Sequence, residues 1–362
     1  QEAVARAYLH ENYLNPFAFP SLLRMEEEIV GIARELFGAP GAAGKLTSGG
    51  TESIFLAVQV ARDHARTSRG VDRPVLVTPE TAHPAFAKAA HYLDVEHVRV
   101  PVSADGRADV AATAEAITER TALVVGSAPC YPYGVIDPIE ALAAVAAERG
   151  CLFHVDACLG GWLLPFWAEL GEPVPPWTLA VPGVTSLSAD VHKYGWATKG
   201  VSVLLHRDKD LQRLQYFLFD GWPGGLYGSA TTAGTRPAAP IAVAWATIQH
   251  LGREGYLRLA GQVRDAARAF RAGIDAIPDL RVTGEPDLAV MEIASEEHDL
   301  AAVADVMEDR GWHLDRQQGG LHLMLSPVHA GVADEFLRDL REAVDSHGTS
   351  RGVEARYGGV AD

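Results

Sequence analysis

Length, composition and charge describe an acidic globular chain. It has 362 residues, 48% of them hydrophobic, and a formal net charge of −16, and such a chain can bury one large core and a smaller one. Nucleic-acid binders usually carry a basic patch or a high pI, so no nucleic-acid partner is expected. No stretch approaches the roughly 20 apolar residues of a membrane-spanning helix, so no membrane span is expected.

The cysteines and the amino terminus indicate the cellular compartment of the protein. Cys130, Cys151 and Cys158 contain no CxxC pair and are odd in number, which suits a reducing environment. The first residues lack the basic-then-apolar order of a signal peptide. We therefore expect a cytoplasmic protein.

Up to residue 206, short apolar runs alternate with alanine-rich stretches that are predicted to be helical. The runs are mostly apolar rather than alternating, as in strands of a largely parallel sheet that helices cover on both faces. The predicted strands are 75–78, 95–100, 122–126, 152–156, 186–190 and 201–206. The fold class is therefore α/β.

The chain divides into three predicted segments. Residues 1–44 form an amino-terminal arm and a helix over 21–37, with Ser21 as its N-cap. Residues 45–250 form the large domain, because a glycine-rich stretch and the start of a long helix follow its last strand. Residues 251–362 form a small carboxyl-terminal α+β domain.

The strongest local signal is the run 190–195 (DVHKYG), between two predicted strands. Ligand sites of open parallel sheets gather at the carboxyl ends of the strands. Near low-dielectric walls, Lys193 can lose its proton and attack an aldehyde as a Schiff-base nucleophile. A solvated loop lysine is the alternative, since lysines are mostly surface residues.

A second signal is Asp156, which closes the apolar strand 152–156. A protonated pyridine ring is a suitable cationic partner, and an acid that keeps it protonated makes the ring an electron sink. Helix capping and metal binding are the alternatives. Beyond His154, no histidine or carboxylate stands at a recognisable ligand spacing, so no metal is expected.

A third signal is the run 47–52 (TSGGTE), which precedes a helical stretch. Glycines at a helix start let backbone N–H groups approach an anion, and the helix dipole favours its charge. A phosphate would fit there. The alternative is an ordinary capping turn with Ser48 or Thr51 as N-cap.

Together these motifs resemble the fold-type I pyridoxal-phosphate enzymes of the group II decarboxylase superfamily, and within it the sphingosine-1-phosphate lyase family. The resemblance covers nearly the whole chain from Asn15 onward. Its motifs are 47–54 (TSGGTESI), 83–86 (HPAF), 134–138 (GVIDP), 154–161 (HVDACLGG), 188–195 (SADVHKYG), 199–200 (KG), 227–229 (YGS) and 233–237 (AGTRP). It implies an aspartate aminotransferase-like large domain with a mostly parallel seven-stranded sheet, plus a small carboxyl-terminal α+β domain.

The resemblance also implies roles around the cofactor, pyridoxal 5′-phosphate. Lys193 would carry it as a Schiff base, Asp156 would pair with the ring nitrogen, and His83 would stack on the ring. The phosphate would lie among Gly50, Thr51 and His192.

Further residues would complete the active site. Ser229 would reach the phosphate in a second subunit, which implies a homodimer with shared active sites; plain turn chemistry is the alternative. Lys199 would serve proton transfer or substrate-phosphate binding. Ser127 would donate to the cofactor, and Tyr131 would line the substrate space, although aromatics in such loops often only pack.

The arm departs from the family at one position. Family members carry Asn-x-Leu-His-Pro, whereas 12–16 reads NYLNP here, so Asn15 replaces the histidine. An amide cannot supply the positive charge that a histidinium offers a phosphate monoester. Asn12 and Asn15 remain candidate substrate residues beside Tyr131 and Lys199.

The expected function is a carbon–carbon lyase that cleaves a 1,2-amino alcohol, phosphorylated or not, to an aldehyde and ethanolamine or its phosphate. The first alternative is an amino-acid decarboxylase of the same superfamily. The second is a catalytically silent pyridoxal-phosphate-binding protein.

Overall fold

The computed structural model describes residues 1–353 and 355, so the last part of the predicted carboxyl-terminal domain lies outside the described residues. The chain forms two compact units, each considered by itself. The first comprises Gln1–Ser103, Arg107–Cys130 and Ile136–Tyr256; the second comprises Ala104–Gly106, Tyr131–Val135 and the chain from Leu257 onward. The predicted segment boundaries at 44 and 250 stay predictions.

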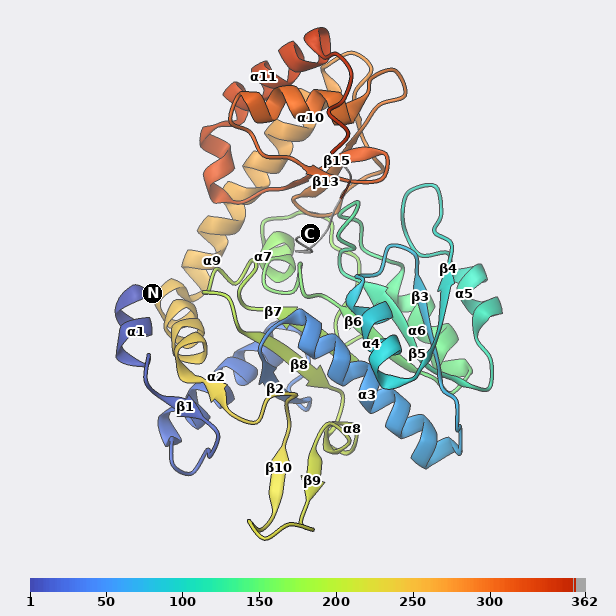
Figure 1. The fold of residues 1–362 in the computed structure, drawn as a ribbon, viewed down its shortest axis with the longest axis vertical. Helices are drawn as coiled ribbons and strands as arrows, with labels where there is room; N and C mark the ends of the chain where they lie inside the picture. Colours follow the sequence, from blue (N-terminus) through green and yellow to red (C-terminus); the bar gives the residue numbers. More distant parts are fainter. Residues whose placement is uncertain (354, 356–362) are drawn as a thin grey trace. The chain divides into compact units, whose positions relative to one another are not determined.

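A sheet forms the centre of the first unit (Figure 1). Within the described ranges it has seven strands, in the order β2-β8-β7-β6-β5-β3-β4. They are β2 (Ala43–Thr47), β3 (Val75–Pro79), β4 (Glu96–Val100), β5 (Thr121–Ser127), β6 (Leu152–Asp156), β7 (Ser186–Asp190) and β8 (Ser202–His206). In this sheet as described, β8 pairs antiparallel with β2 and β7, and the other neighbouring strands pair parallel. The predicted α/β class with a mostly parallel seven-stranded sheet is confirmed.

Most strand bounds agree with the apolar runs. β6 and β7 have the predicted bounds, and the other predicted strands differ by single residues at their ends. β2 was not predicted, because it contains Gly44 and Lys45 and pairs with the distant β8. A Cβ on Gly44 would lie 2.4 Å from Leu205 Cδ2, so glycine permits the close approach of these strands.

Helices cover the sheet. α3 (Gly50–Arg69) contacts β5, β7 and β8, and α6 (Ile139–Glu148) packs on β5 and β6. Ile54, Val58 and Ala61, spaced at helical intervals along α3, are buried in one apolar cluster with Leu76. Each fully buried isoleucine, valine or leucine side chain of this cluster contributes roughly 1.5–3 kcal/mol.

The helix of the amino-terminal segment, α2 (Pro20–Leu36), begins one residue earlier than predicted. The expectation that Ser21 is its N-cap is wrong. Phe19 occupies that position without a side-chain cap, and Pro20 is the first helical residue. Proline suits this position because its missing N–H would have no helical partner.

A hairpin and a long helix follow β8. β9 (Phe217–Phe219) and β10 (Tyr227–Ser229) pair antiparallel and project from the first unit (Figure 1). α9 (Ala238–Asp275) is interrupted at Gly252, whose φ of 53° lies in the left-handed region. Across the described ranges, no helix combines the length and apolarity needed to cross a bilayer.

The second unit is an α+β arrangement, as predicted for the small domain. Its antiparallel sheet has the order β12-β13-β15-β14, and helices α10 (Leu300–Asp309) and α11 (Ala333–Ser346) contact each other. The strands are β12 (Arg281–Val282), β13 (Val290–Ala294), β14 (Asp315–Arg316) and β15 (Gly320–Met324).

Candidate functional site

The candidate site lies where neighbouring parallel strands end. Ser127 closes β5 and pairs in register with Asp156, which closes β6. Asp190 closes β7, the next strand in the sheet. Carboxyl ends of parallel strands meet at one edge, where ligands of such sheets bind. The structure therefore brings the residues of the two strongest sequence signals to one edge.

The amino terminus of α3 meets the same edge. A Cβ built on Gly50 would lie 2.7 Å from Cys158 Sγ and 2.9 Å from Asp190 Oδ2. A side chain larger than hydrogen would collide with this buried thiol and carboxylate. Gly50 is therefore required for the loop 47–50, called the glycine loop below, to lie against the ends of β6 and β7.

Lys193 forms an ion pair inside the site. Its Nζ lies 3.1 Å from Asp190 Oδ2. Burial disfavours the ammonium, but the attraction of Asp190, together with Cys158 and Asp156, outweighs it and raises the pKa of Lys193 above its ordinary value. The expectation that low-dielectric walls let the lysine lose its proton is corrected on this point, because a carboxylate three residues earlier holds the proton.

His192 lies against the same carboxylate. Its Nε2 is 3.5 Å from Asp190 Oδ2, and its Nδ1 accepts the backbone N–H of Val201 at 3.3 Å. Burial lowers the pKa of His192 although Asp190 opposes that shift, so the ring is neutral near pH 7. With Nδ1 accepting, the proton sits on Nε2 and faces Asp190.

Asp190 has capacity left for a further donor. Its side chain is 2% exposed, and its Oδ1 has no hydrogen-bond partner among the described residues. A buried carboxylate oxygen without a donor is costly. Asp190 Oδ1 is therefore available to accept a hydrogen bond from a further donor in the site.

Asp156 is fixed by the backbone around it. Its Oδ1 accepts the N–H of Cys158 at 3.1 Å, and its carbonyl accepts the N–H of Ala128 at 2.8 Å. The residue is 7% exposed. A nearly buried carboxylate of this kind favours a cationic partner.

A hydrogen-bonded layer lies beneath Asp156. His154 Nδ1 lies 2.8 Å from Ser186 Oγ, and His154 Nε2 lies 3.1 Å from Ser188 Oγ. Cys158 Sγ donates to the same Ser188 hydroxyl at 3.2 Å. Burial lowers the pKa of His154 to about 4, so its ring is neutral near pH 7, and both ring nitrogens pair with serine hydroxyls.

His83 lies within electrostatic reach of the site. Its Nδ1 accepts the N–H of Ala85 at 3.1 Å, which fixes the ring at the start of α4 (Ala85–Leu93). Burial lowers its pKa, while Asp156 and Lys193 act on it in opposite directions. The structure thus places a neutral imidazole near both residues.

The glycine loop leaves the start of α3 open. Gly49 is the N-cap, and no side chain caps the helix in the described structure, so the alternative with Ser48 or Thr51 as cap is wrong. Instead, Ser48 N–H donates to Glu52 Oε2 at 2.6 Å. Uncapped first-turn N–H groups of a 20-residue helix form an anion site.

These residues fit pyridoxal phosphate. Lys193 offers an amine for the aldehyde, Asp156 a carboxylate for the protonated ring nitrogen, and the start of α3 a cradle for the phosphate. The uncompensated Oδ1 of Asp190 can accept a further donor. The chemistry of these residues therefore matches the aldehyde, ring nitrogen and phosphate of pyridoxal phosphate.

Lys199 is held beside the site by the backbone. It is exposed, and its Nζ donates to the carbonyl of His192 at 3.0 Å. The arm and Ser229 lie together around a cavity of about 230 Å³ lined by Tyr13, Leu14, Pro16, Ser229 and Arg236 among others. No hydrogen bond or ion pair of the described structure joins Ser229, Asn12 or Asn15 to Lys193.

The two arm asparagines have structural roles in the chain as described. Asn12 Oδ1 accepts the N–H of Leu14 at 3.2 Å, and Asn15 Oδ1 accepts the N–H of Phe17 at 2.9 Å. Both are turns in which a side chain satisfies the backbone two residues on. Their predicted part in substrate binding stays a prediction.

Tyr131 belongs to the second unit. Its ring stacks on His322 with centroids 4.0 Å apart, and its hydroxyl donates to Asp315 Oδ2 at 3.3 Å. Its place relative to Lys193 is not described, so its predicted contact with substrate stays a prediction.

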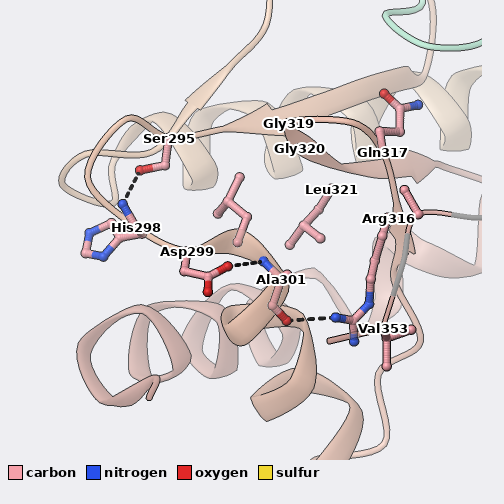
Figure 2. A pocket seen from close by; sticks show the side chains of 12 residues that line it. Ser295, His298, Asp299, Ala301, Arg316, Gln317, Gly319, Gly320, Leu321 and Val353 are labelled. Carbon is pink, nitrogen blue, oxygen red and sulfur yellow. Dashed lines mark hydrogen bonds between the residues drawn. The ribbon is translucent and has the colours of Figure 1, made fainter. Parts of the chain in front are cut away.

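A separate cavity of about 310 Å³ lies in the second unit (Figure 2). Asp299 caps α10 there, accepting the N–H of Ala301, and Arg316 is committed to Asp305 at 2.8 Å. The polar groups of this cavity are paired with the protein itself, and no predicted site residue lines it. It is not the candidate site.

Two residues of the site were missed in the sequence. Asp190 and Glu52 both stand inside the quoted motifs, but neither was given a role. The available signal was position: Asp190 ends a strand three residues before Lys193, and Glu52 stands in the first turn of α3.

Comparison with known proteins agrees with the site. The pyridoxal-dependent decarboxylase conserved domain matches residues 7–291. Sphingosine-1-phosphate lyase of Arabidopsis thaliana is 44% identical over 347 residues, covering 94% of this chain and 64% of the relative. Sphingosine-1-phosphate lyase 1 of Rattus norvegicus is 41% identical, covering 92% of this chain and 60% of the relative. The chain thus spans less than two thirds of the length of these relatives.

Solved structures extend the comparison. Sphingosine-1-phosphate lyase of Burkholderia pseudomallei has a TM-score of 0.93 and 41% identity, covering 96% of this chain and 82% of that one. Glutamate decarboxylase of Lactobacillus brevis has a TM-score of 0.83 at 20% identity, which shows the fold alone.

Fold and site define a pyridoxal-phosphate-dependent α/β protein. The chain belongs to the pyridoxal-dependent decarboxylase family and, within it, groups with the sphingosine-1-phosphate lyases. The resemblance read from the motifs is confirmed, and so is pyridoxal phosphate as the cofactor of the family.

Proposed function

We propose that this chain is a carbon–carbon lyase that cleaves a phosphorylated 1,2-amino alcohol of the sphingoid type to an aldehyde and phosphoethanolamine. The observation that carries the proposal is the convergence of Lys193, Asp156 and the start of α3 in a chain 36–44% identical to sphingosine-1-phosphate lyases. The decarboxylase alternative has the same fold, but the solved glutamate decarboxylase of Lactobacillus brevis is only 20% identical to this chain.

The residues that would hold the cofactor follow from the site. Lys193 would bond its aldehyde, Asp156 would bind its ring nitrogen, and His83 would lie on its ring. Gly50, Thr51 and His192 would bind the phosphate, and Ser127 would donate to the ring hydroxyl. When bound, the cofactor draws electrons from the bond that breaks at the amine-bearing carbon of the substrate.

Side chains of the protein would hold the protons around the bond that breaks. Asp156 would keep a proton on the ring nitrogen of the bound cofactor, because a nearly buried carboxylate stabilises a cation beside it. Asp190 holds the ammonium of Lys193 whenever that lysine is free of the cofactor. The neutral His192 directs its Nε2 toward Asp190 Oδ2 at 3.5 Å.

Lys199 is the proposed link to the substrate. Its Nζ donates to the His192 carbonyl at 3.0 Å, which holds this exposed side chain beside a residue proposed to bind the cofactor phosphate. It would accept the hydroxyl proton of the amino alcohol or bind the substrate phosphate. Tyr131, Asn12 and Asn15 would line the remaining substrate space.

We propose further that the enzyme is a homodimer with shared sites. The hydroxyl of Ser229 is hydrogen-bonded within its own loop in the described chain, and its proposed role is at the cofactor phosphate of a second subunit. The hairpin that ends at Ser229 exposes apolar side chains, including Phe217 (59%), Leu218 (64%), Trp222 (51%) and Leu226 (74%). Exposed apolar patches of this kind mark interaction surfaces.

The proposed location is the cytoplasm. Its support is that Cys130, Cys151 and Cys158 are buried and that no disulfide joins them in the described residues. This is the expected state of thiols in a reducing compartment.

The test is a product analysis. The protein, reconstituted with pyridoxal phosphate, is incubated with sphingosine-1-phosphate and separately with a panel of amino acids, and aldehyde, phosphoethanolamine and carbon dioxide are measured. Aldehyde with phosphoethanolamine, both lost in Lys193→Ala, is the expected result. Carbon dioxide without aldehyde would replace the lyase with the decarboxylase, and neither product would leave a silent binding protein.

A further inference from the structure

One carboxylate joins two loops that lie far apart in the sequence. Glu52 Oε2 accepts the N–H of Ser48 at 2.6 Å, inside the glycine loop. Glu52 Oε1 accepts the backbone N–H of Thr232 at 2.7 Å and also the Thr232 hydroxyl. The two loops are 180 residues apart in sequence, and Glu52 is 7% exposed.

This bridge needs an ionised carboxylate. Burial alone would raise the pKa of Glu52, but the hydrogen bonds from Ser48 and Thr232 outweigh it and lower that pKa. An ionised carboxylate only accepts hydrogen bonds, at both oxygens. It therefore satisfies donors at each end at once, and such charge-assisted bonds are roughly twice as strong as neutral ones.

Thr232 stands in a compact loop with Ser229. Ser229 Oγ donates to the Thr231 carbonyl at 2.8 Å and accepts the Thr231 N–H at 3.3 Å. Thr231 Oγ1 donates to the Ala233 carbonyl at 2.7 Å. Because these short-range bonds tie the loop together, a shift of Thr232 moves the segment that carries Ser229.

We propose that Glu52 is a positioning residue that couples the glycine loop of its own subunit to the Ser229 loop, and through it the two cofactor phosphates of the dimer. The inference rests on the proposed function, in which the glycine loop binds one phosphate and Ser229 reaches the other. Ordering of one loop by a bound phosphate then orders the loop that serves the second site.

Glutamine at this position breaks the bridge at one end. Its amide has the size of the carboxylate but places an NH₂ group against either the Ser48 N–H or the Thr232 donors. Donor facing donor leaves a buried polar group unsatisfied. Thr232→Val is the matched milder variant, because it removes the hydroxyl donor and keeps the backbone bond.

The first experiment compares the binding of pyridoxal 5′-phosphate with that of pyridoxal, which lacks the phosphate, by absorbance titration of the apoprotein. In Glu52→Gln, the dissociation constant for the phosphate form should rise about tenfold or more, with less than about a threefold change for pyridoxal. Thr232→Val should fall between Glu52→Gln and the wild type. Equal weakening of both ligands would mean general structural damage and would overturn the proposal.

The second experiment tests the coupling across the interface with mixed dimers carrying two affinity tags. One subunit carries Lys193→Ala together with Glu52→Gln, and the other subunit is wild type, so that lysine-bound cofactor reports only the wild-type site. That site has an intact Glu52 of its own, but it is served by the Ser229 loop of the altered subunit. Its affinity for pyridoxal phosphate should fall relative to a mixed dimer whose altered subunit carries Lys193→Ala alone.

The outcomes distinguish a failure of the coupling through Glu52 from a failure of the proposed function. Unchanged affinity of the wild-type site would overturn the coupling, even if Glu52→Gln weakens binding within its own subunit. Failure of the wild-type protein to bind pyridoxal phosphate at all would overturn the proposed function, and the inference with it. A wild-type protein that binds the cofactor while Glu52→Gln binds equally well would overturn the inference alone.

Discussion

Lys193 and Asp190 form a close ion pair, with 3.1 Å between Nζ and Oδ2. Asp156, the acid that ends the neighbouring strand, makes no ion pair with Lys193 in the chain as described. The two acids therefore have separate tasks. In the proposed function, Asp190 holds the proton of the lysine and Asp156 binds the ring of the cofactor.

Asp190→Asn should let Lys193 capture pyridoxal phosphate at lower pH. The lysine reacts as the neutral amine, and Asp190 raises its pKa against the effect of burial. Removing that charge leaves only the smaller effects of Cys158 and Asp156 against burial, so the pKa falls and the rise of the capture rate with pH moves to lower pH. At neutral pH the rate should increase roughly tenfold for each unit lost from the pKa.

Stopped-flow absorbance of cofactor capture across pH measures this shift. Asp210→Asn is the matched control, since Asp210 is exposed and pairs with Arg213 away from the site. A capture profile that stays in place or moves to higher pH in Asp190→Asn would contradict the role of Asp190.

Glu26→Gln should destabilise the first unit by about 3–5 kcal/mol, as expected when one partner of a buried ion pair is removed. Glu26 is 2% exposed and lies 3.3 Å from both Arg236 and Lys45; it also accepts the Tyr13 hydroxyl at 2.9 Å. The exposed Glu27 on the same helix supplies the control, Glu27→Gln, for which a change within about 0.5 kcal/mol is expected.

The effect of Glu26 depends on pH with a defined sign. Burial would raise its pKa, but Arg236 and Lys45 outweigh burial and lower it. Its stabilisation is therefore complete above the pKa of an unfolded glutamate and is lost as pH falls through the lower folded-state pKa. Chemical denaturation of the wild type and Glu26→Gln should converge in that acid range; a gap that widens there would refute this assignment.

Asn15→His should increase the preference for phosphorylated substrates at acidic pH. A histidinium near pH 6 can attract a phosphate monoester where the amide cannot, and an exposed charge pair changes kcat/KM by roughly two- to fivefold. Asn15→Ala is the control, because it also loses the hydrogen bond from Phe17 but adds no charge. An equal preference in both variants at every pH would show that Asn15 lies away from the substrate phosphate.

Leu218→Asp should weaken the proposed dimer. The side chain is 64% exposed in the single chain, so the substitution should cost an isolated subunit little stability. Sedimentation velocity should show dissociation at concentrations where the wild type is dimeric. Val328→Asp, at a position 75% exposed in the second unit, should leave the dimer intact; a dimeric Leu218→Asp protein would exclude the hairpin from the interface.

Local sequence patterns predicted the elements that carry the site. β6 and β7 were predicted with their observed bounds, each as a short run that ends in an acid, and strand ends then placed Asp156 and Lys193 at one edge. Glycines before a helical run likewise indicated the open start of α3.

Contacts between residues that are far apart in the chain could not be predicted from local sequence patterns. β2 contains Gly44 and Lys45 and exists through its pairing with β8, so its local pattern gave no signal. The bond from Glu52 to Thr232 depends on a loop brought back by the tertiary fold. The predicted loss of the Lys193 proton failed for a related reason: burial was foreseen, but the direction of the Asp190 side chain was not.

The most direct test of the account is to locate the cofactor on the chain. Borohydride reduces the double bond between a lysine nitrogen and the cofactor aldehyde, and peptide mapping by mass spectrometry then identifies the modified lysine. We predict modification of the peptide at Lys193, absent in Lys193→Ala and retained in Lys199→Ala. Modification at Lys199 or another lysine, with Lys193 unmodified, would contradict the account.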